Sequence, residues 1–276
     1  MEYQKFNPCA QLEPFVECYF SWNSQEKIAP IIIESPPSGF CSIVFNYSDS
    51  YYLETKKFGK QPVPQQFISG QSIYSYNLFL EGKIGLCGIV FKPAALATIF
   101  NLPMYEYVEE RVDLYRIFNN AVLDRVIKQI NSTNDIKEKV QWMEDFLLRQ
   151  FHSKKPELDY IDKAANYIIE HNGMLQVNDL LAESCMSRRT FERKFFQKVG
   201  LSPKYYARIR RIGYLCNLIA GKKKVDWAKI FYECEYYDHA HFIKDFQEFT
   251  GRSPQQYLNE NTELANFVDK PTTQSL

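Results

Sequence analysis

Four side chains between residues 188 and 193 are of types that recognise nucleic acid bases. An arginine can donate two parallel hydrogen bonds to O6 and N7 of guanine, and a glutamate can accept one from N4 of cytosine. The four residues are Arg188, Arg189, Glu192 and Arg193. If one helix presents all four to a DNA groove, its preference should lean toward G·C pairs.

These residues stand in the most basic part of the chain. Residues 186–211 hold nine lysines and arginines but a single acidic residue, Glu192, although the whole chain has a formal net charge of +0. Residues 160–260 carry 16 lysines and arginines against 12 aspartates and glutamates, and residues 1–159 carry 16 against 19. Because a basic helix face is more often simply solvated than bound to nucleic acid, charge alone does not decide the function.

The C-terminal region repeats itself at a spacing of 51 residues, and this observation is independent of charge. The pattern F-x-[RK]-x-F-x4-G-x-S-P-x2-Y runs from Phe191 to Tyr206 and again from Phe242 to Tyr257. Two copies of one structural unit are therefore predicted.

Each copy predicts a helix, a stop and a new helix. Ser187 and Asp238 are suited to cap the first helix, because their side-chain oxygens can accept hydrogen bonds from the free N–H groups of the first turn. The paired phenylalanines are four residues apart and so share one buried face. Gly200 and Gly251 should end these helices, and the Ser-Pro pairs that follow should begin the next ones. The predicted recognition helices span residues 187–198 and 238–249.

Shorter apolar helices are predicted before each copy, over residues 177–184 and 225–233. A short helix, a turn and a second capped helix form a helix-turn-helix unit, whose second helix enters the major groove of DNA. Apolar positions at helical spacing over residues 203–219 predict a linker helix of about 25 Å. Such a linker could hold the two recognition helices about one DNA turn apart, roughly 34 Å, in successive major grooves.

The second recognition helix offers fewer hydrogen-bond donors than the first. The positions that match the four residues of the first helix are His239, Ala240, Ile243 and Lys244. Their apolar members suit at best the methyl groups of thymine. Sequence specificity is therefore expected mainly from the first unit.

Phosphate contacts, which fix the register on DNA without distinguishing bases, are predicted at three positions. Lys204 supplies a cation, and the helix starts at Ser202 and Ser253 supply backbone N–H groups. The three lysines at 222–224 either add to these contacts or form a solvated loop.

The segments RRTFERKFFQKVGLSPKYYARIRR and YYDHAHFIKDFQEFTGRSPQQY, at this spacing, resemble the AraC/XylS family of bacterial transcription regulators. The resemblance covers residues 160–259. It implies a DNA-binding domain of two helix-turn-helix units and an N-terminal domain that binds a small effector or mediates dimerisation. The sequence departs from the family at Phe231, where alanine is usual, and at Glu235, where glycine is usual. A glutamate at that turn should be strained if its backbone is left-handed.

The N-terminal half is predicted to be rich in β-strands. Short apolar runs such as CSIVFNY, QQFISGQ and KIGLCGIVF are bounded by Gly, Pro and Asn. Helices are predicted over residues 94–100, 114–130 and 136–151, the last two as a hairpin around NSTND. The predicted fold class is α+β, with a β-rich N-terminal domain carrying a helical hairpin and an all-α C-terminal domain. The predicted divisions are residues 1–152, a linker at 152–157, a DNA-binding domain at 158–260 and a flexible tail at 261–276.

The aromatic side chains of the β-rich part have two explanations. They could line an apolar effector pocket, although a strand face with alternating aromatics is more commonly plain core. The candidates are Tyr19, Phe20, Trp22, Phe45, Tyr47 and Phe91. The sequence identifies no effector-binding residue. The helical hairpin could equally pack within the chain or form a dimer face.

The sequence does not predict an enzyme, because it holds no GxSxG, no glycine-rich phosphate loop and no HExxH. A catalytic N-terminal domain is kept only as a minor alternative. Seven cysteines without a CxxC pair are expected to be buried thiols, with Cys41 and Cys87 in apolar runs that favour inert thiols. Since His239 and His241 are two residues apart on a helix, they point in different directions, and neither metal nor cofactor is expected.

The expected partner is double-stranded DNA. A small-molecule effector, a second copy of the chain and RNA polymerase are further candidates, and a membrane is not. Because the sequence has no apolar run of eighteen residues and no secretion signal at its start, a cytoplasmic protein is expected. The main alternative is an effector-free DNA-binding or partner-binding protein, which is distinguished by whether any small molecule changes its affinity for DNA.

Overall fold

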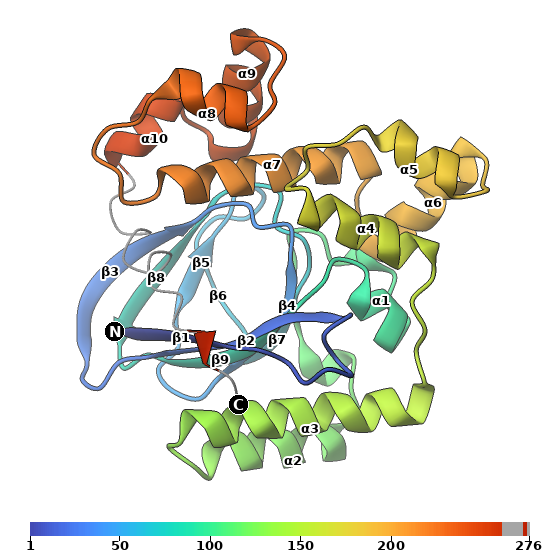
Figure 1. Cartoon of the computed structure of the whole chain (residues 1–276). Helices are drawn as coiled ribbons and strands as arrows, with labels where there is room; N and C mark the ends of the chain where they lie inside the picture. Colours follow the sequence, from blue (N-terminus) through green and yellow to red (C-terminus); the bar gives the residue numbers. More distant parts are fainter. Residues whose placement is uncertain (261–272, 275–276) are drawn as a thin grey trace.

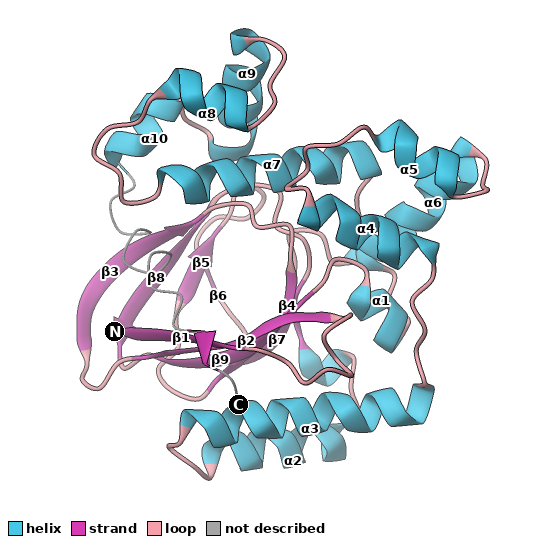
Figure 2. Cartoon of the chain, viewed as in Figure 1, coloured by secondary structure: helices cyan, strands magenta, loops and turns pink. Residues whose placement is uncertain are grey.

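The computed structural model describes residues 1–260 and 273–274. A β-rich N-terminal region is followed by a helical C-terminal region (Figures 1 and 2). The strands are β1 (Glu2–Phe6), β2 (Val16–Asn23), β3 (Ile28–Ser35), β4 (Cys41–Asn46), β5 (Tyr52–Glu54), β6 (Gln61–Pro62), β7 (Gln66–Ser69), β8 (Tyr76–Gly82), β9 (Gly85–Phe91), β10 (Arg111–Asp113) and β11 (Thr273–Gln274). The expected fold class is confirmed.

The helices α2 to α10 lie between β10 and β11 in the sequence, whereas α1 lies between β9 and β10. The α-helices are α1 (Ala95–Phe100), α2 (Asn120–Asn131), α3 (Ile136–Lys154), α4 (Tyr160–Glu170), α5 (Val177–Glu183), α6 (Arg188–Val199), α7 (Pro203–Ile219), α8 (Trp227–Glu233), α9 (His239–Thr250) and α10 (Pro254–Glu260), with 3-10 turns η1 (Met104–Glu106) and η2 (Leu114–Arg116). Within the described residues, no helix combines the length and the apolar character needed to cross a membrane.

The strands form two sheets. The larger has the order β10-β7-β4-β9-β2-β1-β11 and the smaller the order β3-β8-β5-β6. All pairs are antiparallel except β1 with β11. The predicted tail at 261–276 lies outside the described residues apart from β11.

Alternation along β2 explains why the larger sheet is buried on both faces. Tyr19 points to a core shared with α1, α2 and α3, whereas Trp22 points to a core between the two sheets. Phe45 and Phe91 also belong to the helix-side core. Side chains of alternate residues lie on opposite faces of a strand, so one sheet supports both cores. Figure 1 shows α2 and α3 side by side below the sheet.

Two predicted boundaries were wrong. The helix expected over residues 114–130 is broken into η2 and α2, because the Asn119 side chain accepts a hydrogen bond from the N–H of Ala121 and caps a new helix. The linker expected at 152–157 begins later, since α3 continues to Lys154 and ends where Lys155 takes a left-handed conformation.

One side of α7 lies against the N-terminal region, at the docking loop formed by residues 36–40. The hydroxyl of Tyr206 donates a hydrogen bond to the carbonyl oxygen of Gly39 at 2.7 Å. Arg210 donates to the carbonyl oxygen of Ser38, and its guanidinium group lies 4.5 Å from the centre of the Phe40 ring. The two side chains are one helical turn apart, so they present one face of α7 to the loop.

The same face of α7 continues through Gly213. A Cβ atom on Gly213 would lie 2.5 Å from the carbonyl oxygen of Pro37, well inside van der Waals contact. Only a glycine therefore allows the loop to approach the helix this closely.

The first recognition helix, α6, is held by a cluster of charged groups near its C-terminal end. The amino group of Lys198 lies 2.6 Å from Oδ2 of Asp162 and 2.9 Å from Oδ2 of Asp159, both at the start of α4. It also donates to Oγ1 of Thr98 in α1, at 3.0 Å. The cluster thus joins the N-terminal region, α4 and α6.

The second unit contacts the N-terminal region at the C-terminal end of α9. The backbone N–H of Ser75 donates to the carbonyl oxygen of Phe249 at 2.9 Å. Arg252, just before α10, forms an ion pair with Glu34 of β3. Both helix-turn-helix units are therefore fixed on the β-rich region, each through its own contacts.

Candidate DNA-binding interface

The first unit is formed by α5 and α6. Oγ of Ser187 accepts a hydrogen bond from the N–H of Thr190 and caps α6. Phe191 and Phe195 are buried, and Gly200 ends the helix with φ 90°. The predicted cap, core face and stop are all confirmed.

The face of α6 opposite the phenylalanines carries the four predicted base-contacting residues. Arg188, Arg189, Glu192 and Arg193 are all exposed. Arg188 is partly held in place, because it donates to Oδ1 of Asn178 in α5 at 2.8 Å and lies 3.7 Å from Glu192. The two other arginines point away from the core and are placed to meet a ligand outside the protein.

The second unit, formed by α8 and α9, follows the same plan. Oδ1 of Asp238 accepts from the N–H of His241 at 2.7 Å, and Gly251 ends α9 with φ 75°. Phe242 and Phe246 are buried. Of the predicted contact residues, His239, Ala240 and Lys244 are exposed, whereas Ile243 is half-buried and packs against the domain core. Part of the Ile243 side chain, which was expected to contact thymine methyl groups, is therefore packed inside the protein.

The turn of the second unit has the predicted left-handed backbone at Glu235, with φ 51°. In the first unit Cys185 is left-handed, with φ 52°, and it lies two residues past the end of α5 as Glu235 lies two residues past the end of α8. Phe231, the other departure from the family pattern, stacks on Tyr236 and meets Phe242 edge-on, with ring centres 6.5 and 6.4 Å apart. The larger side chain at 231 is therefore accommodated as part of the aromatic core of this unit.

Replacing Glu235 with glycine should stabilise the protein by about 0.5–1 kcal/mol. A left-handed non-glycine residue costs roughly 1–2 kcal/mol, and glycine gives back part of that gain through its greater entropy in the unfolded chain. Urea unfolding measures the change. Glu235→Ala serves as the control because it removes the carboxylate but keeps the strain; equal stability of the two variants would contradict the argument.

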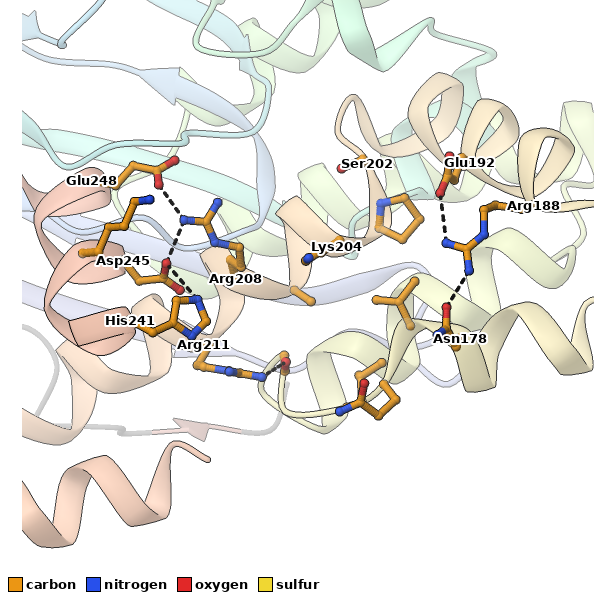
Figure 3. A pocket seen from close by; sticks show the side chains of 17 residues that line it. Asn178, Arg188, Glu192, Ser202, Lys204, Arg208, Arg211, His241, Asp245 and Glu248 are labelled. Atoms are coloured by element: carbon orange, nitrogen blue, oxygen red, sulfur yellow. Dashed lines mark hydrogen bonds and ion pairs between the residues drawn. The ribbon is translucent and has the colours of Figure 1, made fainter. Parts of the chain in front are cut away.

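An open groove of about 960 Å3 separates the two units (Figure 3). Arg188 and Glu192 of α6 lie on one side, and His241 of α9 lies on the other. Lys244, also in α9, lines the groove as well. Lys204 comes from α7, which forms the floor between them. Five lysines and arginines line the groove against the three carboxylates of Glu192, Asp245 and Glu248, and this positive excess suits the groove to a polyanion.

Four of the nine cations in the basic segment are already engaged within the protein. Lys198 belongs to the charged cluster with Asp159 and Asp162, and Arg210 contacts the docking loop. Arg208 pairs with Asp245 and Glu248, and Arg211 donates to the carbonyl oxygen of Gly173. The charge available to a ligand is therefore smaller than the sequence indicates. The exposed remainder is Arg188, Arg189, Arg193, Lys194 and Lys204.

Of the three residues predicted to contact phosphate, two line the groove and the third, Ser253, does not. Ser202 and Lys204 line the groove, and Ser202 caps α7 by accepting from the N–H of Tyr205. Ser253 starts α10, where its N–H donates to the side chain of Gln256 and its Oγ accepts from the N–H of the same residue. This reciprocal capping already uses the N–H of Ser253.

Cysteines and histidines show no arrangement for metal or nucleophilic chemistry in the part of the chain that the structure describes. No group of three or more His, Cys, Asp or Glu side chains there could hold a metal ion. Burial raises the pKa of the Cys41 and Cys87 thiols to about 12, so both are protonated at neutral pH. The prediction that all cysteines are buried was wrong for Cys185, which is exposed at the turn of the first unit, and Cys9 and Cys18 are half-buried.

A cavity of about 580 Å3 in the β-rich region is open to solvent, with the exposed Lys5 and Glu17 among its lining residues, and none of its polar residues had been identified from the sequence. Phe20 and Trp22 line it, as expected for a pocket, whereas Tyr19, Phe45 and Phe91 are plain core. Other lining residues include Tyr3, Phe40, Tyr76, Leu78, Val90 and Arg111. Arg111 donates to Oγ of Ser72 at 2.9 Å and lies over the Tyr76 ring at 5.1 Å.

The linker helix contributes to the wall of this cavity through Asn217. Asn217 follows Tyr206, Arg210 and Gly213 on the same side of α7. One helix therefore forms the floor of the groove between the two units and also borders the cavity of the β-rich region.

Two family models match the chain. Residues 180–260 match a family described as Helix-turn-helix domain, and residues 4–113 match one described as Domain of unknown function (DUF6597). No curated protein sequence matches.

Several solved structures are similar to this chain. ToxT from Vibrio cholerae O395 has 14% identity and a TM-score of 0.46, covering 88% of this chain and 98% of that chain. Unsaturated fatty acid bound wild-type ToxT from Vibrio cholerae strain SCE256 has 14% identity and a TM-score of 0.41, covering 86% and 96%. The AraC-like transcriptional activator CuxR has 12% identity and a TM-score of 0.29, covering 75% and 84%.

The repeated units, their capped recognition helices and the match over residues 180–260 define a DNA-binding protein of the helix-turn-helix class. The match agrees with the double helix-turn-helix domain that the resemblance to the AraC/XylS family implies for this region.

Proposed function

We propose that the protein binds a specific DNA site in the cytoplasm with α6 and α9 in successive major grooves. The exposed face of α6 supports this proposal most directly, because Arg189 and Arg193 lie opposite the buried phenylalanines and are free to meet base edges. The 17 residues of α7 give a linker of about 25 Å, compatible with grooves one DNA turn apart.

Selection of bound fragments from random duplex DNA tests this proposal. The full-length protein is used at about 150 mM salt, where contacts to phosphate alone bind weakly. An enriched site that spans two adjacent major grooves would support it. If no sequence is enriched, sequence-specific binding by both helices is rejected for this protein.

The roles of individual side chains follow from their positions. Arg189→Ala and Arg193→Ala should each weaken specific binding by about 1–3 kcal/mol and relax the preference at one base pair. Lys204→Ala, on the floor of the groove, should weaken binding to all sequences alike, since a phosphate contact carries no base information. Affinities for the selected site and for single-base variants measure both effects. Equal losses on random DNA for all three variants would contradict this division of roles.

We further propose that the β-rich region binds a small effector in its cavity. The cavity is large enough for a small ligand, and aromatic and aliphatic side chains make up about half of its lining. Serines and the charged groups Lys5, Glu17 and Arg111 make up much of the rest and could orient the ligand. A molecule with both apolar and polar parts is the chemistry that suits this mixed lining, and Arg111 is available to bind an acceptor group. Because Asn217 of α7 lines the cavity, a bound effector could contact the linker helix of the DNA-binding region directly.

The fluorescence of Trp22, which lines the cavity, offers a test of effector binding. In a variant with Trp142→Phe and Trp227→Phe, only Trp22 is left to report, and a compound library can be screened against it. Compounds that change the fluorescence should also change the affinity for DNA. If no compound changes both the Trp22 fluorescence and the affinity for DNA, the effector-free alternative is preferred. Homodimerisation and contact with RNA polymerase stay predictions that neither experiment requires.

A further inference from the structure

A pair of ionic contacts joins the linker helix to the second recognition helix. Nη2 of Arg208 in α7 lies 2.8 Å from Oδ1 of Asp245 and 2.5 Å from Oε2 of Glu248, both in α9. Figure 3 shows these contacts at one end of the groove, with the His241 ring on the other side of Asp245. His241 is 3.4 Å from the same carboxylate oxygen. The Asp245 side chain is only 1% exposed, so its position is determined by the protein and not by solvent.

Aromatic side chains hold the arginine from the other side. The guanidinium group of Arg208 lies 5.0 Å from the centre of the Phe249 ring and 5.4 Å from that of Tyr205. The hydroxyl of Tyr205 also donates to Oε1 of Glu248 at 3.1 Å. A planar guanidinium group that is paired on one side and stacked on the other has little freedom to reorient. The contact therefore restricts how α9 can move relative to α7.

The first unit has no counterpart of this contact. At the spacing of the repeat, Asp245 corresponds to Lys194 and Glu248 corresponds to Gln197, neither of which is acidic. The first recognition helix is held instead by Lys198 and the carboxylates of α4. The two recognition helices are therefore positioned by different groups, and the Arg208 contacts act on the second helix alone.

The relative position of the recognition helices matters because DNA is periodic. One extra base pair between two half-sites moves the second by about 3.4 Å and rotates it by roughly 35°. A second helix held at one angle to α7 accepts one spacing, whereas a helix that can reorient accepts several. Since Asp245 is buried beneath the face that carries Lys244, it acts through the placement of α9 and not through contact with a base.

We propose that Asp245, through Arg208, is the positioning residue that sets the spacing of the two DNA half-sites. The proposal rests on the proposed function, because it assumes that both recognition helices bind one DNA site. Glu248 supports the same contact from a more exposed position.

The experiment compares spacing preference in full-length variants. The selected DNA site is prepared with its natural spacer and with spacers one base pair shorter and longer, and affinities are measured by fluorescence anisotropy. Asp245→Asn should reduce the preference for the natural spacer about tenfold, and Glu248→Gln less, since charge-assisted hydrogen bonds of this kind are lost. Affinity for a half-site of the first unit alone should be unchanged.

Glu235→Gln is the matched control, because it removes the same negative charge from an exposed position in the same unit. It should leave the spacing preference unchanged. Removing a negative charge raises the affinity for DNA in general, and this control separates that effect from an effect on the position of α9. Far-UV circular dichroism establishes whether each variant is folded. If Asp245→Asn is not folded, the spacing preference of Glu248→Gln tests the proposal instead.

The outcomes are distinct. A wild-type protein that selects no two-part site overturns both the proposed function and the spacing role. A wild-type protein with a clear spacing preference that both variants retain overturns the role of Asp245 and leaves the proposed function intact. A variant that loses the spacing preference and also loses affinity for the half-site of the first unit overturns the role of Asp245 as well. Such a variant would be impaired in DNA binding as a whole.

Discussion

Lys198→Ala is expected to lower the free energy of unfolding by about 3 kcal/mol, because it leaves a buried carboxylate without its cation. Asp162 is 2% exposed, and its other partners, the Thr98 hydroxyl and the backbone N–H of Asp159, are neutral. Urea unfolding at pH 7.5 measures the loss. Asp162→Asn in the same chain should recover part of it, since a neutral amide does not need a cation. A double variant no more stable than Lys198→Ala would contradict this cause.

The loss should become smaller at lower pH. Burial raises the pKa of Asp162 above its usual value, although hydrogen bonds from Lys198 and Thr98 oppose the change. Without Lys198 the opposition weakens, so the folded state binds a proton more readily than the unfolded state does. Where the folded state holds more protons, stability rises as pH falls. Unfolding at pH 5.5 should therefore show a smaller difference between wild type and Lys198→Ala than unfolding at pH 7.5.

Gly213→Ala should loosen the contact between α7 and the β-rich region while favouring the helix itself. Alanine is the better helix former by about 1 kcal/mol, but its Cβ would meet the carbonyl oxygen of Pro37 at 2.5 Å, and such overpacking typically costs about 1–3 kcal/mol. Hydrogen exchange of the docking loop measures the balance. Its amides should exchange about tenfold faster if docking is weakened by roughly 1.4 kcal/mol.

Gly59→Ala makes the same chemical change where no atom lies within 4 Å of the added carbon. It should leave the exchange of the docking loop unaltered. Unchanged exchange in Gly213→Ala as well would show that the loop can move aside at little cost, and that the close approach does not fix the two regions.

Local signals in the sequence predicted the helices of the DNA-binding region well. The linker helix was predicted over residues 203–219 and found over Pro203–Ile219, because Ser202 and Pro203 determine its start. The recognition helices were found within one residue of the predicted limits. A capping side chain acts on the turn next to it, so its effect can be inferred from neighbouring residues alone.

Contacts between distant residues could not be predicted in this way. The basic segment indicates nine available cations, but Arg210 is engaged by a loop 172 residues away in sequence, and Lys198 by α1 at a separation of 100. Nothing in the local sequence distinguishes the engaged side chains of Lys198 and Arg210 from those of Arg189 and Arg193, which are exposed. The contact of those two arginines with bases stays a prediction, because no DNA is present to test it.

The cavity illustrates the same limit. Alternation along β2 could not tell which face meets the helices and which meets the second sheet, so aromatics of both faces were candidates for one pocket. The arrangement of the two sheets separates them, with Tyr19 in the core and Trp22 at the cavity. The break before α2 had a signal that was missed, namely the capping Asn119.

The three faces of α7 constrain how this protein can evolve. Tyr206, Arg210 and Gly213 face the docking loop, Lys204 and Arg208 face the groove, and the rest of the helix is largely core. Inserting or deleting one residue would turn everything beyond it by about 100° and disrupt all three faces together. Relatives can therefore diverge through substitutions on one face at a time, but a change in the length of this helix would have to be compensated at once in the docking loop, the groove and the core.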